Sequence, residues 1–144
     1  MAITPDEQAA PCERADGQVL SPVVDGRAEL GRRGEALAVA VLEAQGFTIV
    51  ERNFRCRAGE IDLVALDGPT LVFVEVRSRR GDRLGTPFDS VDPRKQARVT
   101  RVARHFLAAR GVGDRDVRFD VVGVRFDAEP PAVEHLRGAF EAVG

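Results

Sequence analysis

The fold is decided by the stretch GEIDLVALDGPTLVFVEVR, residues 59–77. Residues 60–66 and 70–77 are rich in apolar and β-branched residues, and the turn sequence Asp67-Gly68-Pro69 separates them. These two runs predict an antiparallel hairpin. Residues 71–74 (Leu-Val-Phe-Val) are apolar on both faces. They predict a central strand that is covered on both sides.

The segments on either side of this hairpin predict further strands and helices. Before it, residues 29–45 show helical spacing of apolar residues, and residues 47–54 are typical of a strand. After it comes a polar loop, and then Asp92-Pro93, an N-cap followed by Pro at the first helical position, opens a helix that Gly111 ends. Residues 117–126 predict another strand, whereas residues 133–140 fit neither helix nor strand clearly. The order α-β-β-β-α-β predicts an α/β fold with a mixed central sheet flanked by helices.

The length and composition fit a single ordinary domain. The chain has 144 residues, and we expect residues 28–144 to form one domain after a flexible N-terminal extension, residues 1–27, that is rich in Pro and Gly. No apolar run is long enough to cross a bilayer, and no secretory leader pattern is visible. Cys12 and Cys56 predict free thiols. We therefore expect a cytoplasmic protein without a membrane partner.

The charge is distributed unevenly along the chain. Residues 1–26 carry a net −4 and residues 111–144 a net −3, whereas residues 27–110, with sixteen basic and eleven acidic residues, carry +5. A basic middle segment is compatible with a polyanionic partner, although it also fits a solvated surface rich in arginine. Lys95 is the only lysine among 21 basic residues.

Two carboxylates on the predicted hairpin suggest a site. Asp62 lies on the first strand and Glu75 on the second, and Glu75 shares its face with Arg77 because strand side chains alternate. With suitable pairing the two carboxylates become neighbours, and two such oxygen ligands suit Mg²⁺ or Mn²⁺. The alternative is that they form structural ion pairs with Arg57, Arg77 or Arg79.

Basic side chains near this pair could contact a phosphate backbone. On the second predicted helix they recur at i, i+4, i+7 and i+11, apart from the apolar stripe, and others lie in the loop over residues 78–85. The alternatives are an ordinary solvated helix face and a merely flexible loop. The candidates are Arg94, Arg98 and Arg101 on the helix and Arg79, Arg80 and Arg83 in the loop, whereas we expect His105, which shares the helical spacing, and His135 to be structural.

Several motifs, taken in order, resemble the YraN family of bacterial proteins. They are Gly34-Glu35, residues 52–55 (RNFR), 59–64 (GEIDLV) and 72–79 (VFVEVRSR), Lys95-Gln96 and residues 118–122 (RFDVV). The resemblance covers about residues 29–140. It implies the PD-(D/E)XK nuclease superfamily, with a restriction-endonuclease-like fold close to that of Holliday-junction resolvases.

The resemblance also implies roles for individual residues. Asp62 and Glu75 match the metal-binding acidic residues of the superfamily, Glu35 matches an acidic residue that can complete the metal shell, and the carbonyl of Val76 could add a ligand. The superfamily pattern has lysine where this chain has Arg77. Arginine holds phosphate well but cannot lose its proton to act as a base.

Three outcomes follow from this departure. The metal alone activates water while Arg77 holds the phosphate; Lys95, assisted by Gln96, replaces the missing lysine; or the site binds nucleic acid without cutting it. We expect a Mg-dependent endonuclease that acts on DNA, including branched or structured DNA. The alternatives are a catalytically degenerate nucleic-acid-binding or protein-interaction module and, less favoured, a scaffold without a nucleic-acid role. Resolvase-like folds often act as homodimers, although no interface stripe is visible in the sequence.

Overall fold

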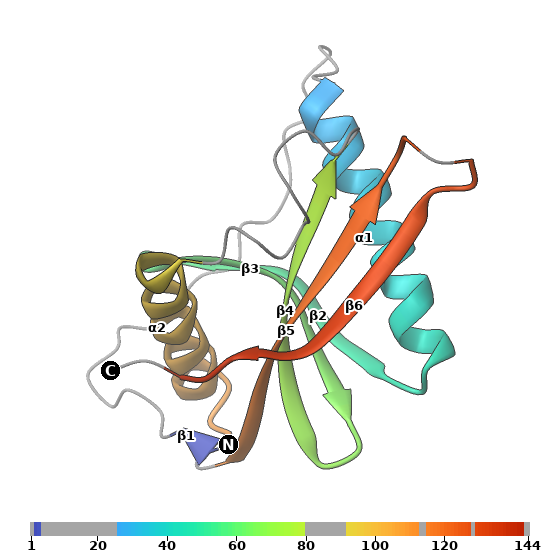
Figure 1. The fold of residues 1–144 in the computed structure, drawn as a ribbon. Coiled ribbons are helices and arrows are strands. Elements are labelled where there is room, and N and C mark those ends of the chain that lie inside the picture. Colours follow the sequence, from blue (N-terminus) through green and yellow to red (C-terminus); the bar gives the residue numbers. More distant parts are fainter. Residues whose placement is uncertain (1, 4–25, 80–91, 113–114, 128, 143–144) are drawn as a thin grey trace.

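The computed structural model describes residues 2–3, 26–79, 92–112, 115–127 and 129–142. In these ranges a mixed sheet lies between two helices (Figure 1). The elements are β1 (Ala2–Ile3), α1 (Gly26–Ala44), β2 (Thr48–Cys56), β3 (Gly59–Asp67), β4 (Thr70–Arg79), α2 (Pro93–Ala109), β5 (Arg115–Arg125) and β6 (Ala132–Phe140).

The sheet has the connectivity that the sequence predicts. Strands β2, β3 and β4 form an antiparallel meander, and α2 then crosses over so that β5 pairs parallel to β4, from Leu71 opposite Val117 to Arg79 opposite Arg125. Helix α2 begins as expected, because the Asp92 carboxylate accepts a hydrogen bond from the Lys95 amide at 2.8 Å and Pro93 follows the cap. The predicted α/β fold with a flanked mixed sheet is therefore confirmed.

Two hydrophobic cores lie on opposite faces of the sheet. Leu71 and Phe73 of β4 pack in the core under α2, whereas Val72 and Val74 pack in the core under α1. All four are at most 3% exposed, which confirms the prediction of a strand buried on both faces. Phe106 of α2 meets Phe73 edge to face at a centroid distance of 5.6 Å, in the geometry that aromatic rings favour.

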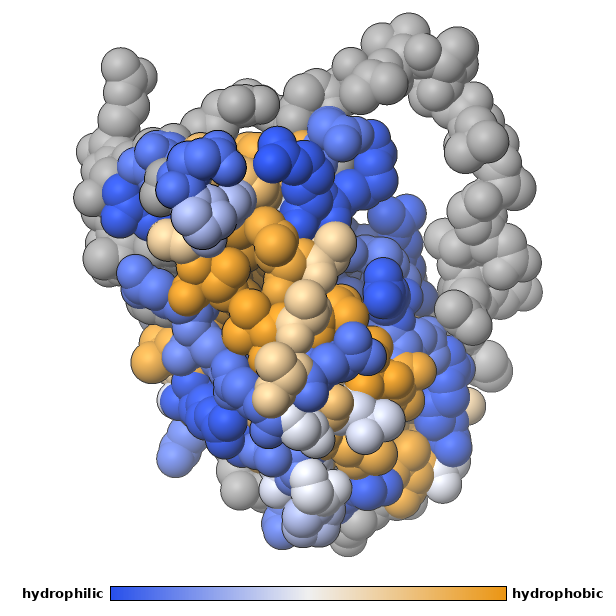
Figure 2. Space-filling model, turned by 90° about the vertical axis from the view of Figure 1, so that its right-hand side faces the viewer, coloured by the Kyte–Doolittle hydropathy of each residue, from blue (hydrophilic) through white to orange (hydrophobic). Residues whose placement is uncertain are grey.

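Apolar side chains also reach the surface on the α1 side. Figure 2 shows them gathered near the centre of this face, with hydrophilic residues around them. The partly buried members that pack against the core under α1 are Leu37, Ile49, Val76, Phe126 and Val133. Neither helix in the described ranges is long and apolar enough to span a bilayer.

The structure differs from the sequence prediction at several element ends and at the C-terminus. Helix α1 begins at Gly26 rather than residue 29, and the strand bounds differ by one or two residues. Residues 132–140, unassigned from sequence, form β6, which pairs antiparallel with β5. Their period is weak because Glu134, Arg137 and Gly138 interrupt the apolar residues.

The proposed N-terminal extension is described only in part. Ala2–Ile3 pair with β5, and the helix takes residues 26 and 27. A strand of two residues carries too little pattern to be recognised in a sequence. Residues 4–25 lie outside the described part of the chain.

Candidate metal and nucleic-acid site

The pairing of β3 with β4 ends beside the two predicted acidic residues. The last paired positions at this end are Leu63 and Val74, which are the sequence neighbours of Asp62 and Glu75. Beyond this pair, the Asp62 carboxylate replaces a backbone carbonyl of β3 as the acceptor, and it accepts a hydrogen bond from the Val76 amide at 2.8 Å. A partly buried amide needs an acceptor, and Asp62 supplies the one that β3 no longer offers.

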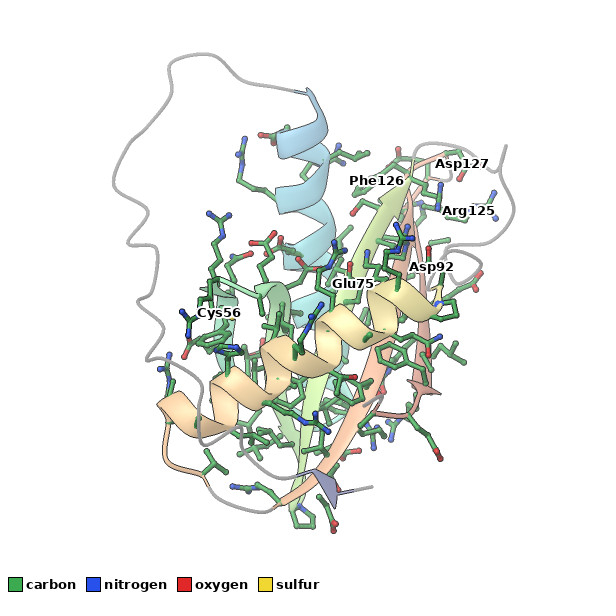
Figure 3. The ribbon with its side chains drawn as sticks, turned by 90° about the vertical axis from the view of Figure 1, so that its left-hand side faces the viewer. Cys56, Glu75, Asp92, Arg125, Phe126 and Asp127 are labelled. Carbon is green, nitrogen blue, oxygen red and sulfur yellow. The ribbon has the colours of Figure 1, made fainter. Side chains whose placement is uncertain are left out.

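Asp62 and Glu75 line one pocket on the α2 side of the sheet. The pocket has a volume of about 310 Å³. Figure 3 shows Glu75 on β4 close to the N-terminal turns of α2. Three carboxylates and two cationic side chains therefore line one small pocket. The lining residues are Gly59, Glu60, Asp62, Glu75, Lys95, Arg98 and Val99.

Lys95 of α2 is the ion-pair partner of Glu75. The Nζ atom of Lys95 lies 2.7 Å from Oε1 of Glu75, and the two side chains are 24% and 16% exposed. The cap at Asp92 fixes the Lys95 backbone and so directs the side chain toward β4. Among the described residues, Glu75 thus pairs with Lys95, and Asp62 accepts from the Val76 amide, rather than either pairing with the arginines of the alternative interpretation.

A second pocket, of about 410 Å³, lies on the α1 side of Asp62. Glu35 of α1, Asp62 and Ser78 line it. The helix comes close to β4 at Gly34, where a Cβ atom would collide with the Ser78 hydroxyl. Glycine at this position therefore allows α1 to bring Glu35 near the end of β4. Asp62 thus stands between two pockets, and Glu35 approaches it from the opposite side to Glu75.

Two partly buried carboxylates of the site resist ionisation. Burial raises the pKa of Asp62 to about 8, with a further contribution from the charge of Glu75 and a smaller one from Glu35, against the lowering effect of the Val76 hydrogen bond. Burial also raises the pKa of Glu35, and a hydrogen bond with Asn53 partly offsets this. Both shifts have the cause that a divalent cation would remove, namely negative charge without enough solvation.

The donor set is suitable for a cation but is small. Within the described ranges no group of three His, Cys, Asp or Glu side chains is close enough to form a metal cluster. Asp62 and Glu75 provide two carboxylates, and Lys95 already places a positive charge against Glu75. Mg²⁺ commonly uses one or two protein carboxylates and keeps several waters, so two carboxylates in a polar pocket fit it.

The other predicted residues are dispersed. Arg77 and Arg79 lie on β4 beyond Glu75, and each has a buried Nε atom without a hydrogen-bond partner in the described structure. Arg77 and Gln96 are not among the described residues that line either pocket. Arg80 and Arg83 lie outside the described residues.

The exposed basic ridge on α2 consists of its predicted arginines. Arg94, Arg98 and Arg101 are exposed, whereas His105 is only 8% exposed. The burial of His105 agrees with the structural role that we expect for it from the sequence. The exposed ridge therefore spans about two turns.

Sequence reasoning missed two residues near the site. Glu60 lines the pocket with Asp62, and Asn53 interacts with Glu35 from β2. Asn53 adopts a positive φ of 55°, which asparagine tolerates better than most residues. The run Arg52-Asn53-Phe54-Arg55 marked this position as part of a motif, but not as a contact of Glu35.

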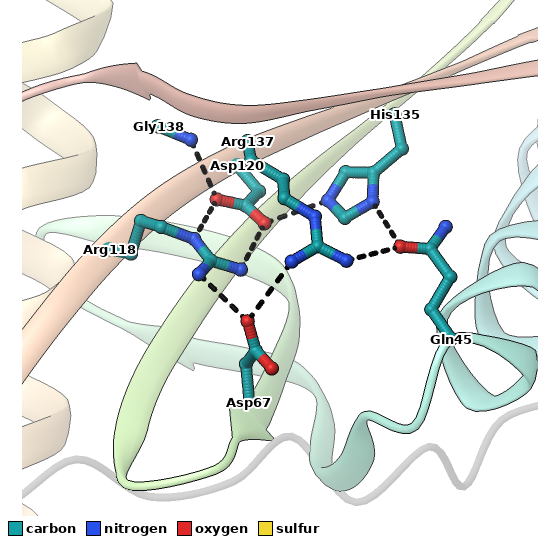
Figure 4. A network of polar contacts seen from close by, with 7 residues as sticks. All are labelled: Gln45, Asp67, Arg118, Asp120, His135, Arg137 and Gly138. Atoms are coloured by element: carbon teal, nitrogen blue, oxygen red, sulfur yellow. Dashed lines mark hydrogen bonds and ion pairs between the residues drawn. The ribbon is translucent and has the colours of Figure 1, made fainter.

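A separate polar network joins β5 and β6 to the end of α1 (Figure 4). Its centre is Asp120, 1% exposed, which accepts hydrogen bonds from Arg118, His135 and the Gly138 amide. Although burial alone would raise the pKa of Asp120, these bonds hold it below its usual value. His135 also contacts Gln45, which agrees with the structural role expected from sequence.

Comparison with known proteins identifies relatives over most of the chain. The model of the uncharacterised protein family UPF0102 matches residues 34–124. UPF0102 proteins of Anaeromyxobacter dehalogenans and Moorella thermoacetica are 49% and 47% identical, over 83% and 79% of this chain and 90% and 97% of their own lengths. A UPF0102 protein of Geotalea uraniireducens is 47% identical, over 78% of this chain and 89% of its own.

Proposed function

The chain belongs to the uncharacterised protein family UPF0102, the YraN family of the sequence resemblance, and from its site we propose that it is a metal-dependent nuclease-like protein acting on DNA. One observation carries the proposal. Asp62 and Glu75, from adjacent strands, line a single pocket together with Lys95 and Arg98. The carboxylates can bind a divalent metal, and the neighbouring cationic groups can bind a phosphate.

In this proposal Asp62 and Glu75 hold Mg²⁺ or Mn²⁺. Glu35 and the carbonyl of Val76, which the resemblance adds, are candidates for completing the shell. The bound ion would polarise a phosphate oxygen and lower the pKa of a water. The protein itself holds Asp62 in place through the Val76 amide and orients Lys95 through the Asp92 cap.

The cationic residues would position the nucleic acid. Arg98 lines the pocket and is exposed, and Arg94 and Arg101 are exposed on the same helix. Arg77 and Arg79 follow Glu75 at every second position of β4, so strand alternation places them on the same face. A phosphate backbone could then run from the pocket along the start of α2. Branched or structured DNA is the substrate class that the family resemblance favours.

The test is cleavage of duplex, flap and four-way-junction DNA in Mg²⁺ and in Mn²⁺. We expect Asp62→Asn and Glu75→Gln each to abolish metal-dependent cutting, while Glu43→Gln, an exposed change on α1, leaves it intact. The two amide variants keep the size of the side chains, so folding is preserved. Residual cutting equal to that of the unmodified protein in both variants would rule out this site.

A second candidate function is a nucleic-acid-binding module without catalysis. Arg77 in the usual position of the lysine favours it, because an arginine cannot give up a proton to serve as a base. The discriminating variant is Arg77→Lys. Metal-dependent cutting that first appears in this variant would indicate a degenerate site. Absence of metal binding even at millimolar Mn²⁺, measured by calorimetry, would exclude the nuclease and leave the binding module.

A further inference from the structure

We propose that Lys95 is a built-in counter-ion, which neutralises Glu75 in the metal-free protein, is displaced when a divalent cation binds, and then turns to the phosphate of the substrate. This inference rests on the proposed metal site and adds a regulatory step to it. The two cations would compete for the same carboxylate. Metal binding and nucleic-acid binding would therefore be linked through a single side chain.

The geometry of the ion pair supports competition. The Lys95 ammonium lies 2.7 Å from Oε1 of Glu75, and both side chains line the pocket that Asp62 also lines. A Mg²⁺ ion binds carboxylate oxygen at about 2.1 Å and orders waters around itself. An ammonium group this close to Oε1 would take up much of that space and would also repel the ion. The metal and this position of Lys95 are thus alternatives.

The structure also allows Lys95 to leave without moving its helix. The Asp92 carboxylate holds the Lys95 amide at 2.8 Å, so the backbone stays fixed. The side chain is a flexible four-carbon stem that ends in a compact charge, and rotation about its bonds is enough to release Glu75. The side chain is 24% exposed, so solvent and a ligand can reach its outer part.

Displacement of Lys95 would free a positive charge for the substrate. In the metal-free pocket Lys95 offsets Glu75, and Arg98 is the other cationic residue that lines it. When a divalent ion takes over Glu75, the released ammonium becomes available to a phosphate beside Arg98. The affinity of the site for phosphate would therefore increase once the metal has bound.

Because Lys95 is the only lysine of the chain, lysine-selective ¹⁵N and ¹³C labelling gives one side-chain ammonium signal that belongs to this residue. We expect Mg²⁺ titration to move this signal from an ion-paired to a free position. In Glu75→Gln the signal should be at the free position from the start and should not respond to Mg²⁺. If the Lys95 signal does not change while calorimetry shows that Mg²⁺ binds, the counter-ion role is refuted, but the proposed metal site is not.

Metal affinity provides the second measurement. Removal of a competing unit charge in Lys95→Met should tighten Mn²⁺ binding on the order of tenfold in the partly screened pocket. Arg32→Met, which removes an exposed charge on α1, should not change it. Unchanged or weaker Mn²⁺ binding by folded Lys95→Met would refute the proposal. If neither this variant nor the unmodified protein binds Mn²⁺ at millimolar concentration, the proposed function fails instead.

The linkage has its own readout in DNA binding without cleavage. With Ca²⁺ as a non-cleaving ion, the unmodified protein should bind junction DNA several-fold more tightly than it does in EDTA. Lys95→Met should lose most of this gain, because the released ammonium is what the phosphate would meet. An equal Ca²⁺-dependent gain in both proteins would contradict the transfer of Lys95 to the phosphate.

Discussion

Replacement of Asp62 by Asn tests the electrostatics of the site without disturbing its packing. Asn keeps the size of the side chain and an oxygen that can accept the hydrogen bond of the Val76 amide, which Asp62 now binds at 2.8 Å. What the variant removes is the ability to carry a negative charge. The stability of the two proteins should therefore differ only where Asp62 ionises.

The size of the effect follows from the raised pKa of Asp62. The folded protein holds a proton on Asp62 up to about pH 8, whereas the unfolded chain loses it near its ordinary value of 3.8. Unfolding between these values releases a proton, so the free energy of unfolding falls as the pH rises. At about 1.36 kcal/mol per pH unit, with partial relaxation of the pocket, we expect a loss of about 2–4 kcal/mol from pH 5 to pH 8.

The assay is urea unfolding in EDTA at pH 5, 6, 7 and 8, for the unmodified protein, Asp62→Asn and the exposed control Glu43→Gln. Asp62→Asn should lack most of the decline that the other two proteins show. Saturating Mn²⁺ at pH 8 should restore stability to the unmodified protein and the control but not to Asp62→Asn, because a ligand that binds only the folded state stabilises it. Parallel pH profiles for all three proteins would refute the reasoning.

Three further changes probe the scaffold around the site. Asp92→Ala removes the N-cap of α2 and should cost about 1 kcal/mol in urea unfolding, whereas Asp92→Asn, which can still cap, should cost much less. Asp120→Asn leaves Arg118 and His135 without their buried carboxylate and should cost about 3 kcal/mol at pH 7. Because the pKa of Asp120 is lowered, this difference should shrink as the pH falls below about 4, where the unfolded chain and then the folded protein take up the proton. Phe106→Ala creates a cavity in the core under α2 and should lower the free energy of unfolding by about 3–5 kcal/mol, which a lower melting temperature would reveal. Val50→Ala, at an exposed position, is the control.

The part of the fold that repeated patterns specify could be predicted from sequence. The apolar run over residues 71–74 identified the central strand, because burial on both faces requires such a run. The Asp92-Pro93 pair located the start of α2 because only a few residue types suit a helix N-terminus. Strand β6 was missed because an edge strand needs only part of one face to be apolar.

The pocket itself depended on three-dimensional contacts that no pattern contains. Sequence placed Asp62 and Glu75 on neighbouring strands, but the ion pair of Glu75 with Lys95 depends on how α2 crosses β4. The spacing of His105 alone would have placed it with the exposed arginines. Its spacing fits the ridge of Arg94, Arg98 and Arg101, but it is only 8% exposed, in agreement with the structural role expected for it.

The hydrogen bond from the Val76 amide to Asp62 makes one acidic group part of both the sheet and the site. Any ligand that draws electron density from that carboxylate weakens its hold on the amide of β4. Binding of a ligand in the pocket would then change the hydrogen bond of the Val76 amide, and the NMR chemical shift of this amide would report the binding. The same coupling limits what position 62 can tolerate, since a side chain without a well-placed oxygen would disturb the strand before it disturbed any chemistry.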